Sequence, residues 1–196
     1  MTSASLLLSI RDGAPSGAPY LVLHGRNGSL EDAQAMGARL GEDALRIAVR
    51  GPRQQTMGGT GQVRGYYWFI GPGDRPELST LGDALYQLEL LLLENSERLG
   101  QRRIGLYGEN QGGVVALVTA LIWPDRVDRL IVADAVLPQN LSDMPLDLPP
   151  LDGMPVLLIG DAEALAATAE YLGAHGANPT IAATADAIPG FIATPR

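Results

Sequence analysis

The segment Gly108-Glu109-Asn110-Gln111-Gly112 lies between an apolar run, 104–107, and a segment rich in small and aliphatic residues. This order predicts a buried strand, a tight turn and a helix, the layout of G-x-S-x-G turns that raise a serine nucleophile to the edge of a parallel sheet. Asn110 stands where that serine would be. Because a carboxamide is not a nucleophile, we expect the turn to be present without its reactive atom.

The residue types around Asn110 suit such a turn. A strand that leads directly into a helix leaves little room for side chains two positions before and after the apex, where Gly108 and Gly112 stand. Asparagine tolerates a left-handed backbone better than most residues do. The sequence therefore predicts the frame of a hydrolytic site with Asn110 at the nucleophile position.

With this motif, the chain resembles bacterial phospholipase/carboxylesterase-type serine esterases of the α/β-hydrolase fold. Three further stretches carry the resemblance, namely 21–29, Tyr67-Trp68-Phe69 and 132–138. The resemblance implies an α/β protein with a mostly parallel central sheet flanked by helices on both faces. We expect one α/β-hydrolase-like domain over residues 1–196.

The order of the expected elements agrees with that fold, because alternating strands and helices favour a parallel sheet. Apolar runs predict strands, and helical spacing, caps and breakers predict helices. The expected strands are 5–10, 19–23, 45–49, 104–107, 129–133, 155–159 and 180–183. The expected helices are 29–40, 81–99, 112–122 and 162–174. Residues 51–79 are expected to form a long loop, which is usually functional or mobile in a compact domain.

Composition excludes several classes of partner and site. The formal charge of −8 argues against a nucleic-acid backbone or an anionic membrane surface as partner. The absence of cysteine excludes a thiol nucleophile, disulfides and a thiolate zinc site. Neither a cofactor nor a metal is indicated. Because no segment approaches the roughly 18 apolar residues of a membrane span, and no signal peptide is recognisable, we expect a cytoplasmic protein.

The catalytic triad is expected to be degenerate. An esterase of this kind needs a serine, an acid and a histidine in chain order. The resemblance places His24 in the oxyanion loop and not at the base position, and no histidine follows the final expected strand. His175, at a helix end, is interpreted as structural, and Asp161 as a helix cap in preference to a relay acid.

The remaining frame could still bind a ligand. The resemblance places the two oxyanion amides at Arg26 and Gln111, with His24 and Gly25 beside them. Two convergent donors near the start of a helix would accept a carbonyl or carboxylate group of a small molecule. Tyr67 and Trp68 are expected to line the same site. Alternatively, these features persist only because the fold requires them.

Two enzymatic alternatives stay open. Asp134 or Glu109, desolvated beside aromatic residues, could act as general acid or base in a lyase, cyclase or isomerase. A carboxylate could also activate water for weak hydrolysis of carboxylic esters. Against this, Asp134 could be a solvated loop residue and Glu109 could pair with Arg26 or another loop arginine. The leucine-rich helix 81–99 is interpreted as deeply buried, although a homodimer contact is the alternative.

Overall fold

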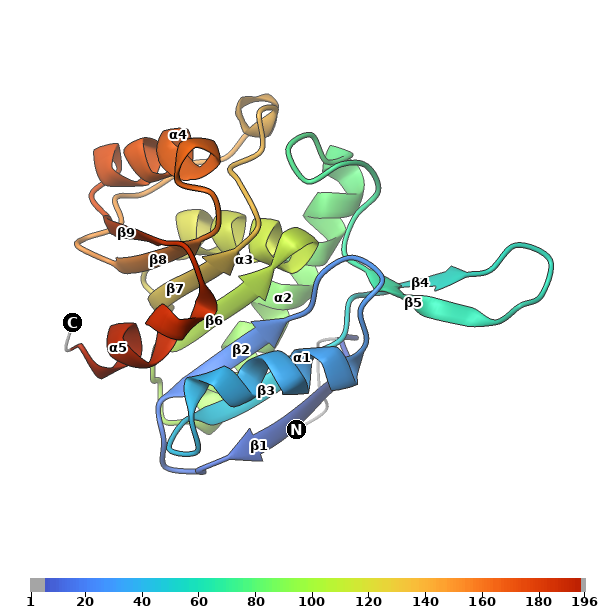
Figure 1. The fold of residues 1–196 in the computed structure, drawn as a ribbon, viewed down its shortest axis with the longest axis horizontal. Helices are drawn as coiled ribbons and strands as arrows, with labels where there is room; N and C mark the ends of the chain where they lie inside the picture. The colour runs from blue at the N-terminus through green and yellow to red at the C-terminus, as the bar shows by residue number, and fades with distance from the viewer. Residues whose placement is uncertain (1–5, 195–196) are drawn as a thin grey trace.

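The protein, seen as a computed structural model, is described over residues 6–194 and has a central sheet of seven strands in the order β1-β3-β2-β6-β7-β8-β9 (Figure 1). Only the edge strand β1 is antiparallel to its neighbour, and all the other pairings in this sheet are parallel. The strands are β1(Ser9–Gly13), β2(Pro19–Leu23), β3(Leu45–Val49), β6(Ile104–Glu109), β7(Val127–Ala133), β8(Pro155–Ile159) and β9(Asn178–Ala182). The mostly parallel sheet predicted from the sequence is confirmed.

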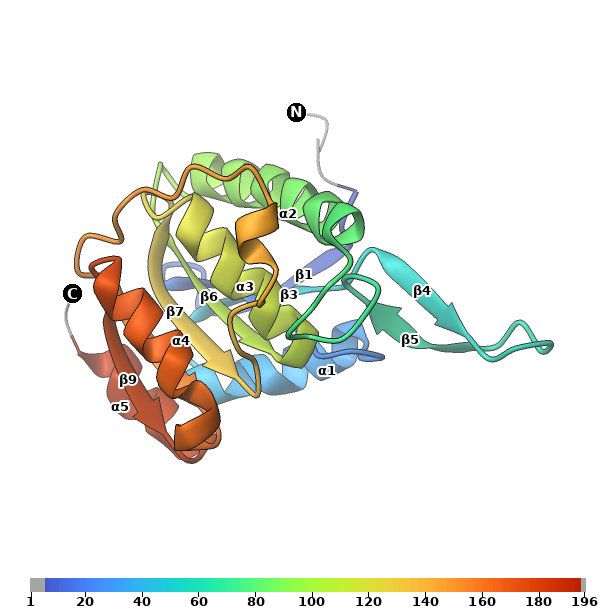
Figure 2. The ribbon, with the colours of Figure 1, turned by 90° about the horizontal axis from the view of Figure 1, so that it is seen from above.

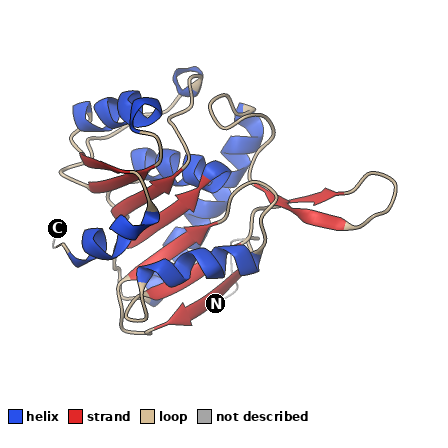
Figure 3. Ribbon diagram, viewed as in Figure 1, coloured by secondary structure: helices blue, strands red, loops and turns tan. Residues whose placement is uncertain are grey.

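Helices cover both faces of this sheet (Figures 2 and 3). Alternate residues of one strand enter different cores: Leu21 packs on the side of α2, α3 and α4, whereas Val22 packs on the side of α1 and α5. The α-helices are α1(Leu30–Gly37), α2(Leu78–Arg98), α3(Asn110–Ile122), α4(Ala162–Ala174) and α5(Ile188–Ala193). The hydrophobic runs in the strands follow from this two-sided burial.

Helix starts agree well with the sequence signals. Ser29 and Asp32 form the expected capping box at α1, with Ser29 Oγ accepting from the Asp32 amide at 3.2 Å. Helix α2 begins at Leu78 and not at Leu81, because the Glu77 side chain accepts hydrogen bonds from the amides of Ser79 and Thr80. These bonds, together with those from the hydroxyl groups, lower the pKa of Glu77 to about 2.

Three expectations about the elements are corrected. The edge strand expected over 5–10 starts at Ser9 and extends to Gly13, where it pairs with Leu45; Ser5 lies outside the described residues. The expected loop 51–79 contains a hairpin, β4(Arg53–Thr56) and β5(Val63–Tyr67), which projects from the body (Figure 1). Helix α5 was not predicted, because six residues are too few for a helical period to show.

The leucines of α2 are mainly part of the core. Leu81, Leu88 and Leu92 are fully buried, whereas Leu90 and Leu93 are half-buried. Deep burial is therefore the observed role of most of this face. No helix within residues 6–194 has the length and apolar character needed to cross a bilayer.

Candidate functional site

The turn at Asn110 has the expected geometry. Strand β6 ends at Glu109, Asn110 has a φ of 49°, and α3 begins there. A Cβ on Gly108 would overlap the carbonyl oxygen of Gly112, and a Cβ on Gly112 would overlap the carbonyl oxygen of Leu23. Both glycines are therefore required by close backbone approach, which explains why the motif is recognisable in the sequence.

The Asn110 side chain bonds to its own helix terminus. Its Oδ1 accepts a hydrogen bond from the backbone amide of Gln111 at 2.9 Å. The Gln111 amide, which the sequence suggested as an oxyanion donor, thus already has an acceptor. The carboxamide of Gln111 itself points into the core, where it accepts from the Trp68 amide at 3.1 Å and donates to the Phe69 carbonyl at 2.9 Å.

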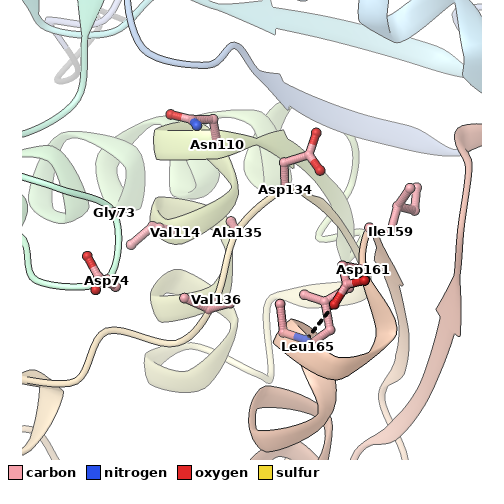
Figure 4. A pocket seen from close by; sticks show the side chains of 12 residues that line it. Gly73, Asp74, Asn110, Val114, Asp134, Ala135, Val136, Ile159, Asp161 and Leu165 are labelled. Atoms are coloured by element: carbon pink, nitrogen blue, oxygen red, sulfur yellow. Dashed lines mark hydrogen bonds between the residues drawn. The ribbon is translucent and has the colours of Figure 1, made fainter.

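A cavity of about 340 Å³ lies beside Asn110 (Figure 4). It brings Asn110 together with Asp134 and Asp161, three residues that the sequence suggested for the site. Asp74, which the sequence did not single out, is also part of its lining. The remaining lining residues are mostly aliphatic or small: Gly73, Val114, Ala135, Val136, Ile159, Gly160, Ala164 and Leu165.

The carboxylates of this cavity differ in their surroundings. Asp134 follows β7 with a φ of 49° and is exposed, and among the described residues none hydrogen-bonds to or pairs with its carboxylate. Asp161 caps α4, since its Oδ1 accepts from the Ala164 amide at 2.9 Å, so the expected capping role is confirmed. Asp134 and Asp161 also line an adjoining cavity of about 580 Å³.

Glu109 lies with Tyr107 on the face of the sheet that α1 and α5 cover. It accepts a hydrogen bond from Arg39 at 2.6 Å and one from the Tyr107 hydroxyl at 3.0 Å. Burial, and then the charge of Glu109, raise the pKa of Tyr107 to about 12. The arginine partner expected for Glu109 is present, but it belongs to the 3-10 turn after α1 and not to the loop of Arg26.

The loop Gly25-Arg26 lies next to the turn at Asn110. A Cβ on Gly25 would lie 3.3 Å from Asn110 Cβ, so the loop is close to the turn. Gly25 and Arg26 nevertheless line a separate cavity of about 460 Å³ together with Arg39 and Glu109. The structure therefore does not bring Arg26 into the lining of the cavity beside Asn110.

The imidazole of His24 is held by hydrogen bonds to the backbone. It is fully buried, and its Nε2 accepts a hydrogen bond from the Gly51 amide at 2.9 Å. Because Nε2 must be unprotonated to accept, Nδ1 carries the proton and donates to the Gly25 carbonyl at 2.7 Å. Burial lowers the pKa of His24, which favours this neutral form.

His175 lies at the end of α4 and is bonded within that helix. It follows the last turn of α4, stacks on Tyr171 with ring centroids 4.1 Å apart, and its Nδ1 donates to the Tyr171 carbonyl at 2.8 Å. These are the two histidines of the chain. Both imidazoles thus have local partners, and neither is hydrogen-bonded to Asn110.

The two aromatic residues expected to line the site lie elsewhere. Trp68 is completely buried and its Nε1 donates to the His24 carbonyl at 2.8 Å. Tyr67 ends β5 of the hairpin and is half-buried. Neither residue contributes to the lining of the cavity beside Asn110, which is instead formed by aliphatic side chains such as Val114 and Leu165.

Comparison with solved structures identifies the architecture. The chain is similar to the carboxylesterase of Bacillus cereus, with a TM-score of 0.72 and 19% identity over 92% of this chain and 85% of that chain. It is equally similar to a carboxylesterase of Mesorhizobium loti, with a TM-score of 0.73 and 20% identity over 93% of this chain and 91% of that one. This protein has the α/β-hydrolase fold.

A phospholipase/carboxylesterase of Dyadobacter fermentans is a further solved structure to which this chain is similar. The TM-score is 0.66 and the identity 16%, over 92% of this chain and 87% of that chain. No protein-family model and no curated protein sequence matches the chain. At these identities the similarity establishes a carboxylesterase-like fold, and a shared fold does not fix the chemistry of a site.

Proposed function

We propose that this protein binds a small carbonyl- or acyl-bearing ligand in the cavity beside Asn110 and does not hydrolyse it by a serine-type mechanism. One observation supports this most strongly: Asn110 occupies the apex of the turn, and its Oδ1 accepts from the Gln111 amide. Acyl transfer on this fold needs a nucleophile at the apex and a free amide on the next residue. Asn110 provides no nucleophile at the apex, and its side chain occupies the amide of Gln111.

The histidines support the same proposal. His24 is held between Gly51 and Gly25, and His175 is bonded to Tyr171, so no imidazole is placed to take a proton at the apex. Triad residues act as a unit, and the loss of the nucleophile alone already removes nearly all of the rate that the triad provides. A serine hydrolase mechanism is therefore not supported at this turn.

Ligand binding is supported by the cavity. Its volume of about 340 Å³ falls within the range of small-molecule sites, and its walls combine aliphatic side chains with a few polar groups. The cavity lies at the carboxyl ends of β6 and β7, where ligands bind in open parallel sheets. The adjacent start of α3 places a positive partial charge where a carbonyl oxygen is favoured.

Acid/base chemistry without a covalent step is the second candidate, and Asp134 is the residue that favours it. Its carboxylate has no partner within residues 6–194, lines the cavity and could orient or activate a water molecule. However, this role was expected of a carboxylate desolvated beside aromatic residues, whereas Asp134 is exposed and no aromatic residue is part of the described cavity lining. Glu109, the other candidate, is ion-paired with Arg39 and does not line this cavity.

Assays with p-nitrophenyl acetate and butyrate test this proposal. We expect the purified protein to cleave neither ester above the rate of a heat-denatured sample, while titration with a non-hydrolysable methyl ketone shifts NMR signals of residues near Asn110. Turnover that is lost in Asn110→Ala would overturn the proposal. Turnover that is lost in Asp134→Asn, but retained in the exposed control Asp147→Asn, would establish the carboxylate mechanism in its place.

A further inference from the structure

The charges around the cavity narrow the class of ligand, an inference that rests on the proposed function. We propose that the ligand carries an ammonium group in addition to its carbonyl group, and that carboxylate ligands are rejected. Asp74, Asp134 and Asp161 line the cavity, and within residues 6–194 no arginine or lysine belongs to its lining. Figure 4 shows these carboxylates on different sides of the apolar wall formed by Val114 and Val136.

No cationic side chain of the described residues forms an ion pair with the three carboxylates. None of them forms a salt bridge within the described part of the chain, in contrast to Glu109, which is paired with Arg39. The carboxylate of Asp74 has a single long hydrogen bond, from Gln139 Nε2 at 3.4 Å. Asp161 accepts one amide hydrogen bond as a cap, and the carboxylate of Asp134 has no partner among the described residues. Their negative charge is therefore available to a ligand.

The wider sequence reinforces this local charge. Between Arg129 and Arg196 the chain contains no arginine or lysine, and all its charged residues are acidic: Asp134, Asp143, Asp147, Asp152, Asp161, Glu163, Glu170 and Asp186. This segment supplies β8, α4 and one side of the cavity. A cleft lined by one sign of charge on a low-dielectric wall raises the local concentration of the opposite ion.

Arg75, Arg26 and Arg39 lie near the cavity but do not compensate the negative charge of its carboxylates. Arg75 follows Asp74 in sequence but is exposed and is not part of the lining. Arg26 and Arg39 line the separate cavity behind the turn, where Arg39 is paired with Glu109. An anionic ligand would thus meet three carboxylates with no compensating cation from the described lining.

The apolar wall indicates which kind of ammonium group fits. Val114, Val136, Ile159 and Leu165 present aliphatic surface between the carboxylates. An alkylated ammonium group can place its methyl or methylene groups against such a surface while its charge remains near the acidic rim. A strongly hydrated inorganic cation gains nothing from this apolar contact.

A series of esters with matched shape tests the charge preference on the full chain. The probes are acetylcholine, its uncharged isostere 3,3-dimethylbutyl acetate, and the anionic monoethyl succinate, with dissociation constants measured by NMR titration. We expect acetylcholine to bind about tenfold more tightly than the isostere at low salt, and the anion to bind most weakly. The advantage should shrink as salt rises from about 20 mM to about 500 mM.

Single substitutions test which carboxylates cause the preference for the cationic ester. Asp134→Asn and Asp74→Asn should each weaken acetylcholine binding about threefold without changing binding of the isostere. The control Asp147→Asn removes a charge of the same segment away from the cavity and should have little effect. Far-UV circular dichroism checks that each variant is folded.

The outcomes separate this inference from the proposed function. Equal binding of acetylcholine and its isostere, or tighter binding of the anion, overturns the charge preference and leaves a neutral-ligand site. Rapid release of acetate from acetylcholine overturns the non-hydrolytic proposal but not the preference for a cation. Failure of all three probes to bind at millimolar concentration overturns both.

Discussion

The backbone amide of Gln111 donates a hydrogen bond to Oδ1 of Asn110, its preceding residue, at 2.9 Å. Because α3 begins at Asn110, this amide belongs to the first turn, whose N–H groups have no acceptor inside the helix. Asn110 itself has a left-handed φ of 49°. The Asn110 side chain therefore occupies one of the donors at the start of α3.

Asn110→Ser tests whether any proton acceptor is hidden at the turn. We expect ester cleavage to stay within about twofold of the background rate, since a serine hydroxyl without a positioned base is a poor nucleophile. The loss of the local hydrogen bond should also cost about 1 kcal/mol of stability. The measurement is p-nitrophenyl acetate hydrolysis combined with urea unfolding. A hundredfold rise in rate would show that a base operates here.

Gln111→Met tests whether the Gln111 carboxamide joins the turn to the aromatic segment. The variant keeps the side-chain length but leaves the Trp68 amide and the Phe69 carbonyl buried without their partner. Two unsatisfied buried groups should lower the free energy of unfolding by about 2 to 5 kcal/mol. Gln54→Met, on the exposed hairpin, is the matched control and should change stability by less than about 0.5 kcal/mol. Similar small effects in both variants would contradict the structural role of Gln111.

Local signals explain which parts of the fold could be predicted. The strands from Pro19 to Leu23 and from Pro155 to Ile159 are apolar throughout because both of their faces are covered, and the structure has the same bounds. The turn at Asn110 was recognisable because Gly108 and Gly112 satisfy a steric requirement that depends on near neighbours in sequence. The hairpin was missed because Arg53 to Thr56 is polar and Gly65 interrupts its partner.

The site was predictable only in part, because its composition depends on long-range packing. An aromatic residue such as Trp68 gives the same sequence signal whether it lines a cavity or fills the core, and here it is completely buried with its Nε1 bonded to the His24 carbonyl. The partner of Glu109 is Arg39, seventy positions away. Asp74 lies in a segment without periodicity, so nothing in the sequence linked it to Asp134.

Gly112→Ala tests the close approach between the turn and β2. The added methyl group would overlap the carbonyl oxygens of Leu23 and His24, which are backbone atoms that cannot move aside alone. We expect a loss of about 3 kcal/mol or failure to fold. Gly82→Ala, on α2, is the control, because no atom lies within 4 Å of the new Cβ and alanine favours helix; we expect a gain of up to about 1 kcal/mol. Equal melting temperatures for the two variants would rule out the steric requirement.

The buried neutral state of His24 makes stability depend on pH. Burial lowers the pKa of His24 in the folded protein, whereas the unfolded side chain titrates near about 6.5. Below that pH the unfolded state binds more protons, so stability should be complete above about pH 6.5 and fall as the pH decreases toward 5. Protonation of Nε2 would also break the bond from the Gly51 amide.

Urea unfolding between pH 7.5 and 5 measures how steeply the free energy of unfolding depends on pH. This range lies above the window between about pH 4.5 and 2 in which the stabilisation from Glu77 is lost. His24→Gln should be less stable at neutral pH but show a shallower slope, and a wild-type free energy that is constant over this range would contradict the buried neutral assignment.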